Sequence, residues 1–122
     1  MEGTPPEPAH YKLDVWQAAM RLVKAVYEAS GSFPNDERFG LTSQMRRSAI
    51  SVPSNIAEGA ARGFSMELVR FLQIARASLM ELDTQIWLAK DLGLLDDIKQ
   101  IRAHILRILA MLNGLIRQKT GT

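Results

Sequence analysis

The sequence predicts an all-α protein, an antiparallel four-helix bundle whose helices run alternately up and down. Four segments of the chain repeat apolar residues every three or four positions, as amphipathic helices do. Short stretches rich in glycine, proline or aspartate separate these segments, and short connections favour antiparallel neighbours. No segment shows the strict alternation of β-branched residues that would predict a strand.

The composition is that of one globular domain. The chain has 122 residues, of which 47% are hydrophobic and 23% are charged. Because glutamate and three of the five prolines crowd into the first residues, we expect a flexible tail over 1–10 and the bundle domain over 11–122. The absence of cysteine excludes disulfides and thiol chemistry and suits a reducing cytoplasm, the location we expect. We expect neither a secretion signal nor a membrane span.

The first helix is expected to begin at Asp14, whose side chain suits an N-cap and is followed three residues later by Gln17. This helix carries two apolar faces, so we expect it to be covered on two sides. One face is formed by Leu13, Trp16, Met20, Val23 and Tyr27, and the other by Val15, Leu22, Val26 and Ala29.

The second helix is unusual because Pro53 lies inside its apolar stripe, which consists of Leu41, Met45, Ala49, Val52 and Ile56. Proline lacks a backbone N–H and crowds the carbonyl four residues earlier, so we expect a kink or break near Val52. Most other positions of this segment are small or polar, which predicts that a neighbouring helix approaches closely.

The third helix is expected to run from a Ser65 cap to about Leu92, and the fourth from about Asp96 to Gln118. The third helix has a core stripe and, on another side, a second row of residues. Some residues of this second row are apolar, and the core of a single four-helix bundle would leave them in solvent. We therefore expect copies of the chain to associate as a homo-oligomer. The predicted subunit contacts are Val15, Leu22, Val26, Val69, Met80 and Trp87.

Polar residues follow one side of the second helix and face the third. We interpret them as a structural polar network beside the proline, formed by Ser51, Ser54, Asn55, Glu58, Glu81 and Gln85. The alternative is a small active site in the same row. The chain has no phosphate-binding glycine motif, and neither histidine has a metal-ligating partner at helical spacing. We expect no catalytic residue, no metal and no cofactor.

The basic residues are the candidates for ligand binding. The net charge is only +2, which by itself does not indicate nucleic acid as the partner. The positions of the cations must therefore indicate the class of ligand. The arginine guanidinium forms bidentate hydrogen bonds with phosphates and also with carboxylates, so nucleic acid and acidic protein surfaces are both candidate partners. Symmetry in an oligomer would repeat a small basic patch and add its phosphate contacts. The predicted nucleic-acid-binding residues are Arg21, Lys24, Arg46, Arg47 and Arg62.

The stretch from Arg38 to Gly59, RFGLTSQMRRSAISVPSNIAEG, resembles the hallmark of a bacterial four-helix bundle family, the proteins encoded by intervening sequences in 23S ribosomal RNA genes. The segments 14–19 and 71–85 are similar to the first and third helices of that family, so the resemblance covers about residues 11 to 95. The fourth helix matches only in pattern.

The resemblance implies a compact bundle that assembles as a ring, typically a homopentamer, without an established enzymatic activity. Members are often labelled ribosomal proteins, a name that follows from the location of their genes. Related accessory variability determinant proteins of diversity-generating retroelements are pentameric and basic, and they associate with a reverse transcriptase and nucleic acid.

Three functional hypotheses follow. The favoured one is a non-enzymatic homo-oligomeric bundle that binds RNA or DNA phosphates or serves as accessory to another nucleic-acid protein. The second is a protein-interaction scaffold in which the arginines pair with carboxylates at interfaces. The third is an enzyme, which would need a pocket joining Ser51 or Ser54 to Glu58 and Glu81.

Overall fold

The computed structural model describes residues 3, 6–63 and 65–121 of the chain. It contains the four helices α1 (Asp14–Ser30), α2 (Leu41–Ala61), α3 (Met66–Asp91) and α4 (Lys99–Thr120). Two short 3₁₀ turns, η1 (Ala9–Lys12) and η2 (Asn35–Glu37), precede α1 and α2. The described residues include no strand, so the all-α prediction is confirmed.

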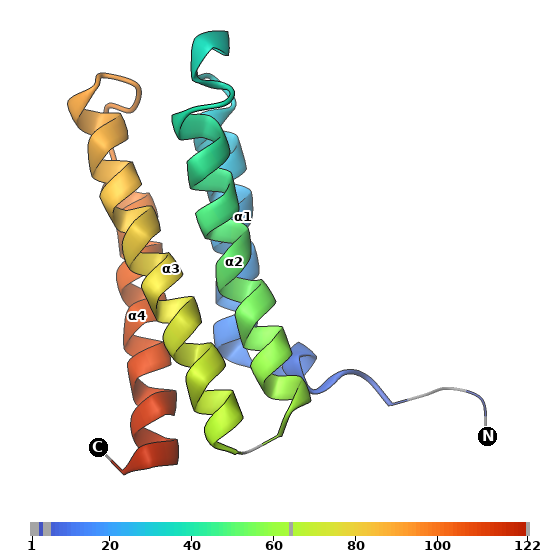
Figure 1. Cartoon of the computed structure of the whole chain (residues 1–122). Coiled ribbons are helices and arrows are strands. Elements are labelled where there is room, and N and C mark those ends of the chain that lie inside the picture. Colours follow the sequence, from blue (N-terminus) through green and yellow to red (C-terminus); the bar gives the residue numbers. More distant parts are fainter. Residues whose placement is uncertain (1–2, 4–5, 64, 122) are drawn as a thin grey trace.

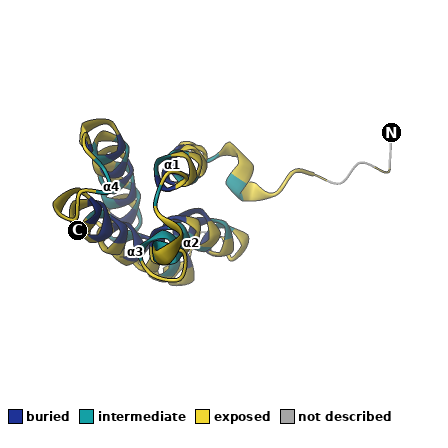
Figure 2. Ribbon diagram, turned by 90° about the horizontal axis from the view of Figure 1, so that it is seen from above, coloured by how far each residue is buried: buried dark blue, intermediate teal, exposed yellow. Residues whose placement is uncertain are grey.

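The helices pack in the order of the chain, and α4 closes the bundle against α1 (Figures 1 and 2). Within the described residues, the diagonal pairs α1/α3 and α2/α4 have no close backbone contact. The α1–α2 and α3–α4 connections lie at one end of the bundle, and the α2–α3 connection and both chain termini lie toward the other (Figure 1). This is the alternating up-and-down arrangement that short connections favour.

The core is formed by the predicted stripes of α2, α3 and α4. Figure 2 shows that the buried residues lie on the sides of the helix ribbons that face one another. The stripe residues that are buried are Met45, Ala49, Val52 and Ile56 of α2, Leu68, Leu72, Ala75, Leu79, Leu82 and Ile86 of α3, and Ile101, Ile105, Ile108 and Leu112 of α4.

The two apolar faces of α1 differ in burial, and the face that carries the predicted subunit contacts is the one that enters the core. Met20 and Tyr27 of the first face are 46% and 41% exposed, whereas Val15, Leu22 and Val26 of the second face are buried together with Ala18 and Ala19. The two alanines lack bulk, so α1 can lie closer to its neighbours on that side. Four of the six predicted subunit contacts therefore belong to the core of the single chain and offer no surface to a second copy: Val15, Leu22, Val26 and Val69.

Helices α2 and α3 approach most closely, as the small residues of α2 predict. A methyl group on Gly59 would lie 2.9 Å from Cβ of Phe71 and 3.1 Å from Cδ1 of Leu68. Helix α2 continues past Pro53, so the predicted break is wrong, and the kink stays a prediction. The α-helix continues for eight residues after the proline, to Ala61.

Helix ends differ in detail from the predictions. Leu13, not Asp14, is the N-cap of α1, because the turn η1 leads directly into the helix; the Gln17 amide donates instead to the backbone oxygen of Tyr11, 2.8 Å away. Ser65 is the N-cap of α3, without a side-chain hydrogen bond. Helix α4 begins three residues later than expected, where the Asp97 carboxylate accepts the N–H of Lys99 at 2.9 Å.

The turn η1, within the N-terminal segment, packs against α1 and α2. Residues 1, 2, 4 and 5 of the predicted tail lie outside the described residues, and its predicted boundary at residue 10 falls inside η1. The His10 ring packs edge-on against the Trp16 ring, with 4.8 Å between centroids. In the part of the chain that the structure describes, no helix combines the length and apolarity needed to cross a membrane.

Candidate nucleic-acid interface

The five predicted nucleic-acid-binding residues lie in three separate places. Arg46 and Arg47 lie near the start of α2, Arg21 and Lys24 lie on α1 facing α4, and Arg62 follows the far end of α2. Since a helix rises about 1.5 Å per residue, α2 alone separates Arg46 from Arg62 by more than 20 Å. The three places have different electrostatic surroundings.

A depression of about 500 Å³ at the start of α2 brings Arg46 and Arg47 together with a third arginine, Arg38. We call it the arginine depression. Its lining residues are Tyr27, Arg38, Phe39, Thr42, Ser43, Arg46, Arg47 and Ile50. Among the described residues, the lining contains three cations, two aromatic rings, two aliphatic hydroxyls and no carboxylate, so its formal charge is +3.

Arg46 is held in place by the end of α1. Its Nε donates to Oγ of Ser30 at 2.9 Å, and Nη2 donates to the backbone oxygen of Tyr27 at 3.5 Å. The guanidinium carbon lies 4.4 Å from the centre of the Tyr27 ring, a cation–π distance. A guanidinium fixed in this way loses little side-chain entropy when it binds a ligand.

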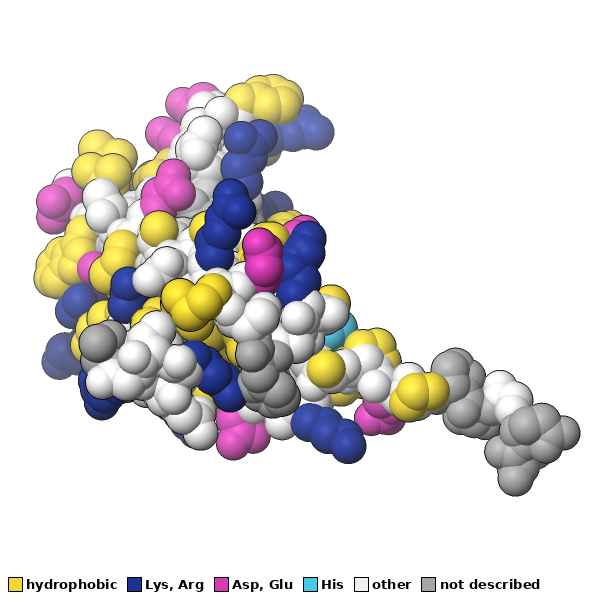
Figure 3. Space-filling model, turned by 60° about the horizontal axis from the view of Figure 1, so that its bottom comes forward, with side chains coloured by type: hydrophobic (Ala, Val, Ile, Leu, Met, Phe, Trp, Pro, Cys, Tyr) yellow, Lys and Arg dark blue, Asp and Glu magenta, His cyan; other side chains and the backbone are white. Residues whose placement is uncertain are grey.

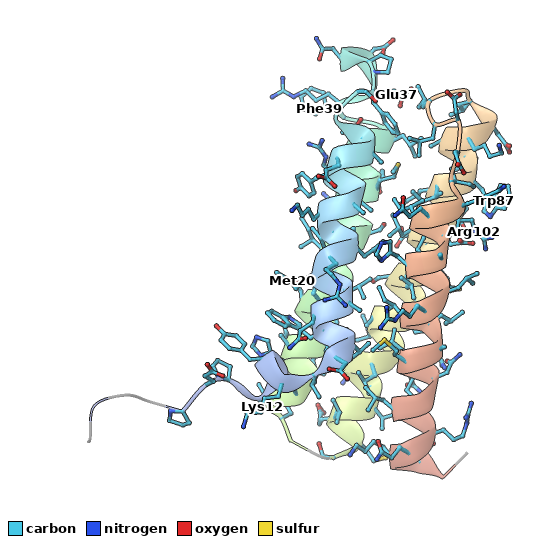
Figure 4. The ribbon with its side chains drawn as sticks, turned by 180° about the vertical axis from the view of Figure 1, so that it is seen from behind. Lys12, Met20, Glu37, Phe39, Trp87 and Arg102 are labelled. Atoms are coloured by element: carbon cyan, nitrogen blue, oxygen red, sulfur yellow. The ribbon has the colours of Figure 1, made fainter. Side chains whose placement is uncertain are left out.

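Arg38, Phe39 and Arg47 are exposed around this fixed guanidinium. The Phe39 ring is 85% exposed, and the guanidinium carbon of Arg38 lies 5.3 Å from its centre. Figure 4 shows Phe39 and Glu37 at the end of the bundle formed by the α1–α2 connection, away from Trp87 and Arg102. The Glu37 carboxylate accepts the N–H of Leu41 at 3.2 Å and so caps α2 beside the depression.

Arg21 and Lys24 lie in a cleft between α1 and α4 that also contains acidic groups. The cleft has a volume of about 510 Å³, and Glu28 and Asp97 line it with the two cations and His104. Two carboxylates balance two cations, so this cleft attracts a phosphate group less than the arginine depression does.

Arg62 is engaged with its own neighbours at the far end of the bundle. Its Nε lies 4.0 Å from a carboxylate oxygen of Glu67, and its guanidinium carbon lies 4.7 Å from the centre of the Phe71 ring. On the end of the molecule drawn in Figure 3, basic and acidic side chains are interspersed. Arg62 is therefore not part of the cluster around Arg46.

The predicted polar network is smaller than expected. The hydroxyls of Ser51 and Ser78 are 2.8 Å apart, and the Asn55 amide donates to the backbone oxygen and hydroxyl of Ser51 at 2.8 and 3.0 Å. Ser78 was missed, because a single serine on an apolar helix face carries no signal of its partner. Oε1 of the buried Gln85 has no hydrogen-bond partner among the residues that the structure describes.

The other three predicted members of the network, Ser54, Glu58 and Glu81, are exposed and have no hydrogen bond or ion pair among the described residues. A carboxylate stays in water unless a buried partner offsets the cost of its desolvation. Neither Glu58 nor Glu81 has such a partner among the described residues.

Sequence reasoning also missed the aromatic members of the arginine depression. Tyr27 was assigned only to an apolar face of the first helix, and Phe39 was not considered as a site residue. A phenylalanine between Arg38 and Gly40, in a polar connection outside any helical stripe, was the available signal. Within the described part of the chain, no group of three or more acidic or histidine side chains is placed to hold a metal ion.

The fold and this depression define a small helical-bundle protein with a basic, aromatic surface site. A family model described as "23S rRNA-intervening sequence protein" matches residues 11–114, and the chain belongs to this family. The match extends beyond the motifs in residues 11 to 95 and includes most of α4. A search of curated proteins finds no match to the chain.

Proposed function

We propose that the protein is a non-enzymatic bundle that binds the phosphates of RNA or DNA through the arginine depression. The observation that carries the proposal is the presence of three arginines in one depression whose lining includes no carboxylate. The description of the family refers to 23S rRNA, which loosely suggests a role connected with RNA. An accessory role beside another nucleic-acid protein, in the cytoplasm, is part of the proposal.

The non-enzymatic role in this proposal is supported by the surroundings of the polar residues on α2 and α3. The Ser51 hydroxyl is already bonded to Ser78, and Glu58 and Glu81 are exposed without a hydrogen bond among the described residues. A nucleophile and a base within hydrogen-bonding reach of each other would be the sign of catalysis. We therefore assign no catalytic residue and no cofactor.

The proposal includes assembly into a ring of identical subunits, with the pentamer that the family resemblance implies. Met80 and Trp87 are the predicted contacts that stay on the surface, 37% and 42% exposed. A ring of five would repeat the arginine depression five times, and the phosphate contacts of the copies would add on one strand.

A protein-interaction scaffold is the second candidate, favoured by a groove of about 310 Å³ between α1 and α2. Apolar side chains form most of its lining: Trp16, Met20, Val23, Ile50, Pro53 and Ala57, with Ser54. An exposed apolar groove is a common feature of protein interfaces. In this reading the arginines beside the groove would meet carboxylates of a partner protein.

Fluorescence anisotropy with labelled RNA and DNA at low salt tests the proposal. We expect the wild-type protein to bind both and Arg47→Glu to weaken binding at least about tenfold, because it places an anion in the depression. Arg107→Glu is the matched control, since it makes the same charge change at an exposed arginine of α4. Equal losses in the two variants would contradict a localised site, and undetectable binding by the wild type would refute the function.

A further inference from the structure

We propose that the arginine depression holds an unpaired nucleotide of a single-stranded nucleic acid, with its base stacked on the Phe39 ring and its phosphates on Arg38, Arg46 and Arg47. The inference rests on the proposed function, because it presumes that the arginines bind phosphates. It adds the class of nucleic acid and the role of the aromatic ring.

The exposure of Phe39 is the first step of the argument. Burying a phenylalanine side chain stabilises a folded protein, yet this chain leaves the Phe39 ring 85% exposed. Tyr11, Tyr27 and Trp87, the other exposed aromatic residues described, each expose less than half of their surface. Tyr11 stacks on Trp16, and arginines lie over Tyr27, over Trp87 and, at 5.3 Å, over Phe39 itself, so the exposed fraction is what distinguishes Phe39. Phe39 thus offers the most open ring of the described surface.

The surroundings of the ring point to a nucleotide rather than to an apolar partner. Three arginines share the depression with Phe39, and no carboxylate lines it. A purely apolar partner would have to desolvate these cations, which is costly without an anion. A phosphodiester supplies the anion, and the adjacent base supplies a flat face for stacking. The hydroxyls of Thr42 and Ser43 lie within the same lining and can bond to phosphate or sugar oxygens.

The geometry favours an unpaired base. A base in a duplex is already stacked on both faces, so it cannot present a face to a protruding side chain. In a single strand the bases can turn outward, and aromatic side chains and guanidinium planes then stack on them. Arg46, held by Ser30 and Tyr27, is the fixed cation against which the strand would be positioned. The N-terminus of α2 is not part of the proposed site, because the Glu37 carboxylate accepts the N–H of Leu41 there.

A matched pair of strands separates stacking from phosphate binding. The probes are a labelled oligothymidylate of about 12 nucleotides and an abasic strand of the same length, which keeps every phosphate but carries no base. We expect the wild-type protein to bind oligothymidylate about 5- to 150-fold more tightly than the abasic strand, the range for one stacked base. Phe39→Ala is expected to remove this preference, and Phe39→Trp to retain it.

Two variants serve as controls. Met66→Ala removes another highly exposed apolar side chain, 69% exposed, at the other end of the bundle, and should keep the preference. Arg47→Gln should weaken the binding of both strands by a similar factor, because the phosphates are common to both. Circular dichroism of Phe39→Ala should match the wild type, since the ring makes few contacts to lose.

The outcomes distinguish the inference from the proposed function. If the wild type binds both strands equally and Arg47→Gln weakens both, phosphate binding stands and base stacking is refuted. If neither strand binds at low salt, both proposals fall. If Phe39→Ala lowers the sedimentation coefficient and leaves the strand preference intact, Phe39 is a subunit or protein contact and the inference is overturned.

Discussion

The close approach of α2 and α3 predicts opposite effects for the same substitution at two helical glycines. Gly59 of α2 is buried, and a methyl group there would lie 2.9 Å from Cβ of Phe71. Gly114 of α4 is exposed, and a methyl group there would meet no atom within 4 Å. Both residues lie inside helices, so Gly59→Ala and Gly114→Ala gain the same helix propensity.

The magnitude follows from two opposing terms. Replacing glycine by alanine in a helix stabilises by about 0.5–1 kcal/mol, because alanine loses less backbone entropy. At Gly59 the added carbon comes about 0.6–1 Å closer to Phe71 Cβ than the optimal separation of carbon atoms. Cβ of Phe71 is attached to the α3 backbone, so relief requires the helices to separate, and overpacking costs about 1–3 kcal/mol. The two variants should therefore differ by about 1–3 kcal/mol, with Gly59→Ala the less stable.

Urea unfolding followed by far-ultraviolet circular dichroism measures this difference. All samples need the same protein concentration, because an oligomer gains stability with concentration. We expect Gly114→Ala to be as stable as the wild type or up to about 1 kcal/mol more stable, and Gly59→Ala to be less stable than the wild type. If Gly59→Ala is stabilised as much as Gly114→Ala, the close packing of α2 on α3 is refuted.

Three further predictions concern α3. Gln85→Met should raise the free energy of unfolding by about 1 kcal/mol in urea titrations, since it removes a buried oxygen that has no partner; an unchanged or lower value would contradict this. Asp83→Asn should cost about 1 kcal/mol by weakening the 2.9 Å ion pair with an arginine of α4, and the loss should shrink at high salt; a salt-independent loss would exclude an electrostatic cause. Met80→Glu combined with Trp87→Glu should give monomers by sedimentation velocity, whereas Met66→Glu should not; an unchanged sedimentation coefficient in the double variant would refute these contacts.

Most of the fold could be predicted because each helix has a recognisable pattern in its own stretch of sequence. The stripes of α2, α3 and α4 combine strong helical periodicity with breaks at glycine, proline and aspartate, and those stripes form the core. Helix α1 was ambiguous because it has two apolar stripes. Periodicity measures the direction of each stripe but not the closeness of packing, and the small Ala18 and Ala19 favour the side that is buried.

The candidate site could be predicted only in part, because it depends on which segments meet. Arg46 and Arg47 were recognised as candidates, but their partners come from the end of α1 and from the α1–α2 connection. The separation of Arg62 could have been recognised from the helix rise alone. The exclusion of Arg21 and Lys24 from the site could not have been recognised in the same way. Asp97, which balances their charge, precedes α4 and lies near α1 only because α4 packs against α1.

The salt dependence of binding tests the central claim, that the arginine depression neutralises phosphates. Each phosphate contact to a single strand contributes about −0.7 to the slope of log Kobs against log salt, so three arginines give a slope of about −2 for one depression. Measured on oligothymidylate between about 50 and 200 mM salt, Arg47→Gln should make the slope shallower by about 0.7 per depression engaged. A slope near zero for the wild type, or the same slope for Arg47→Gln, would contradict the account.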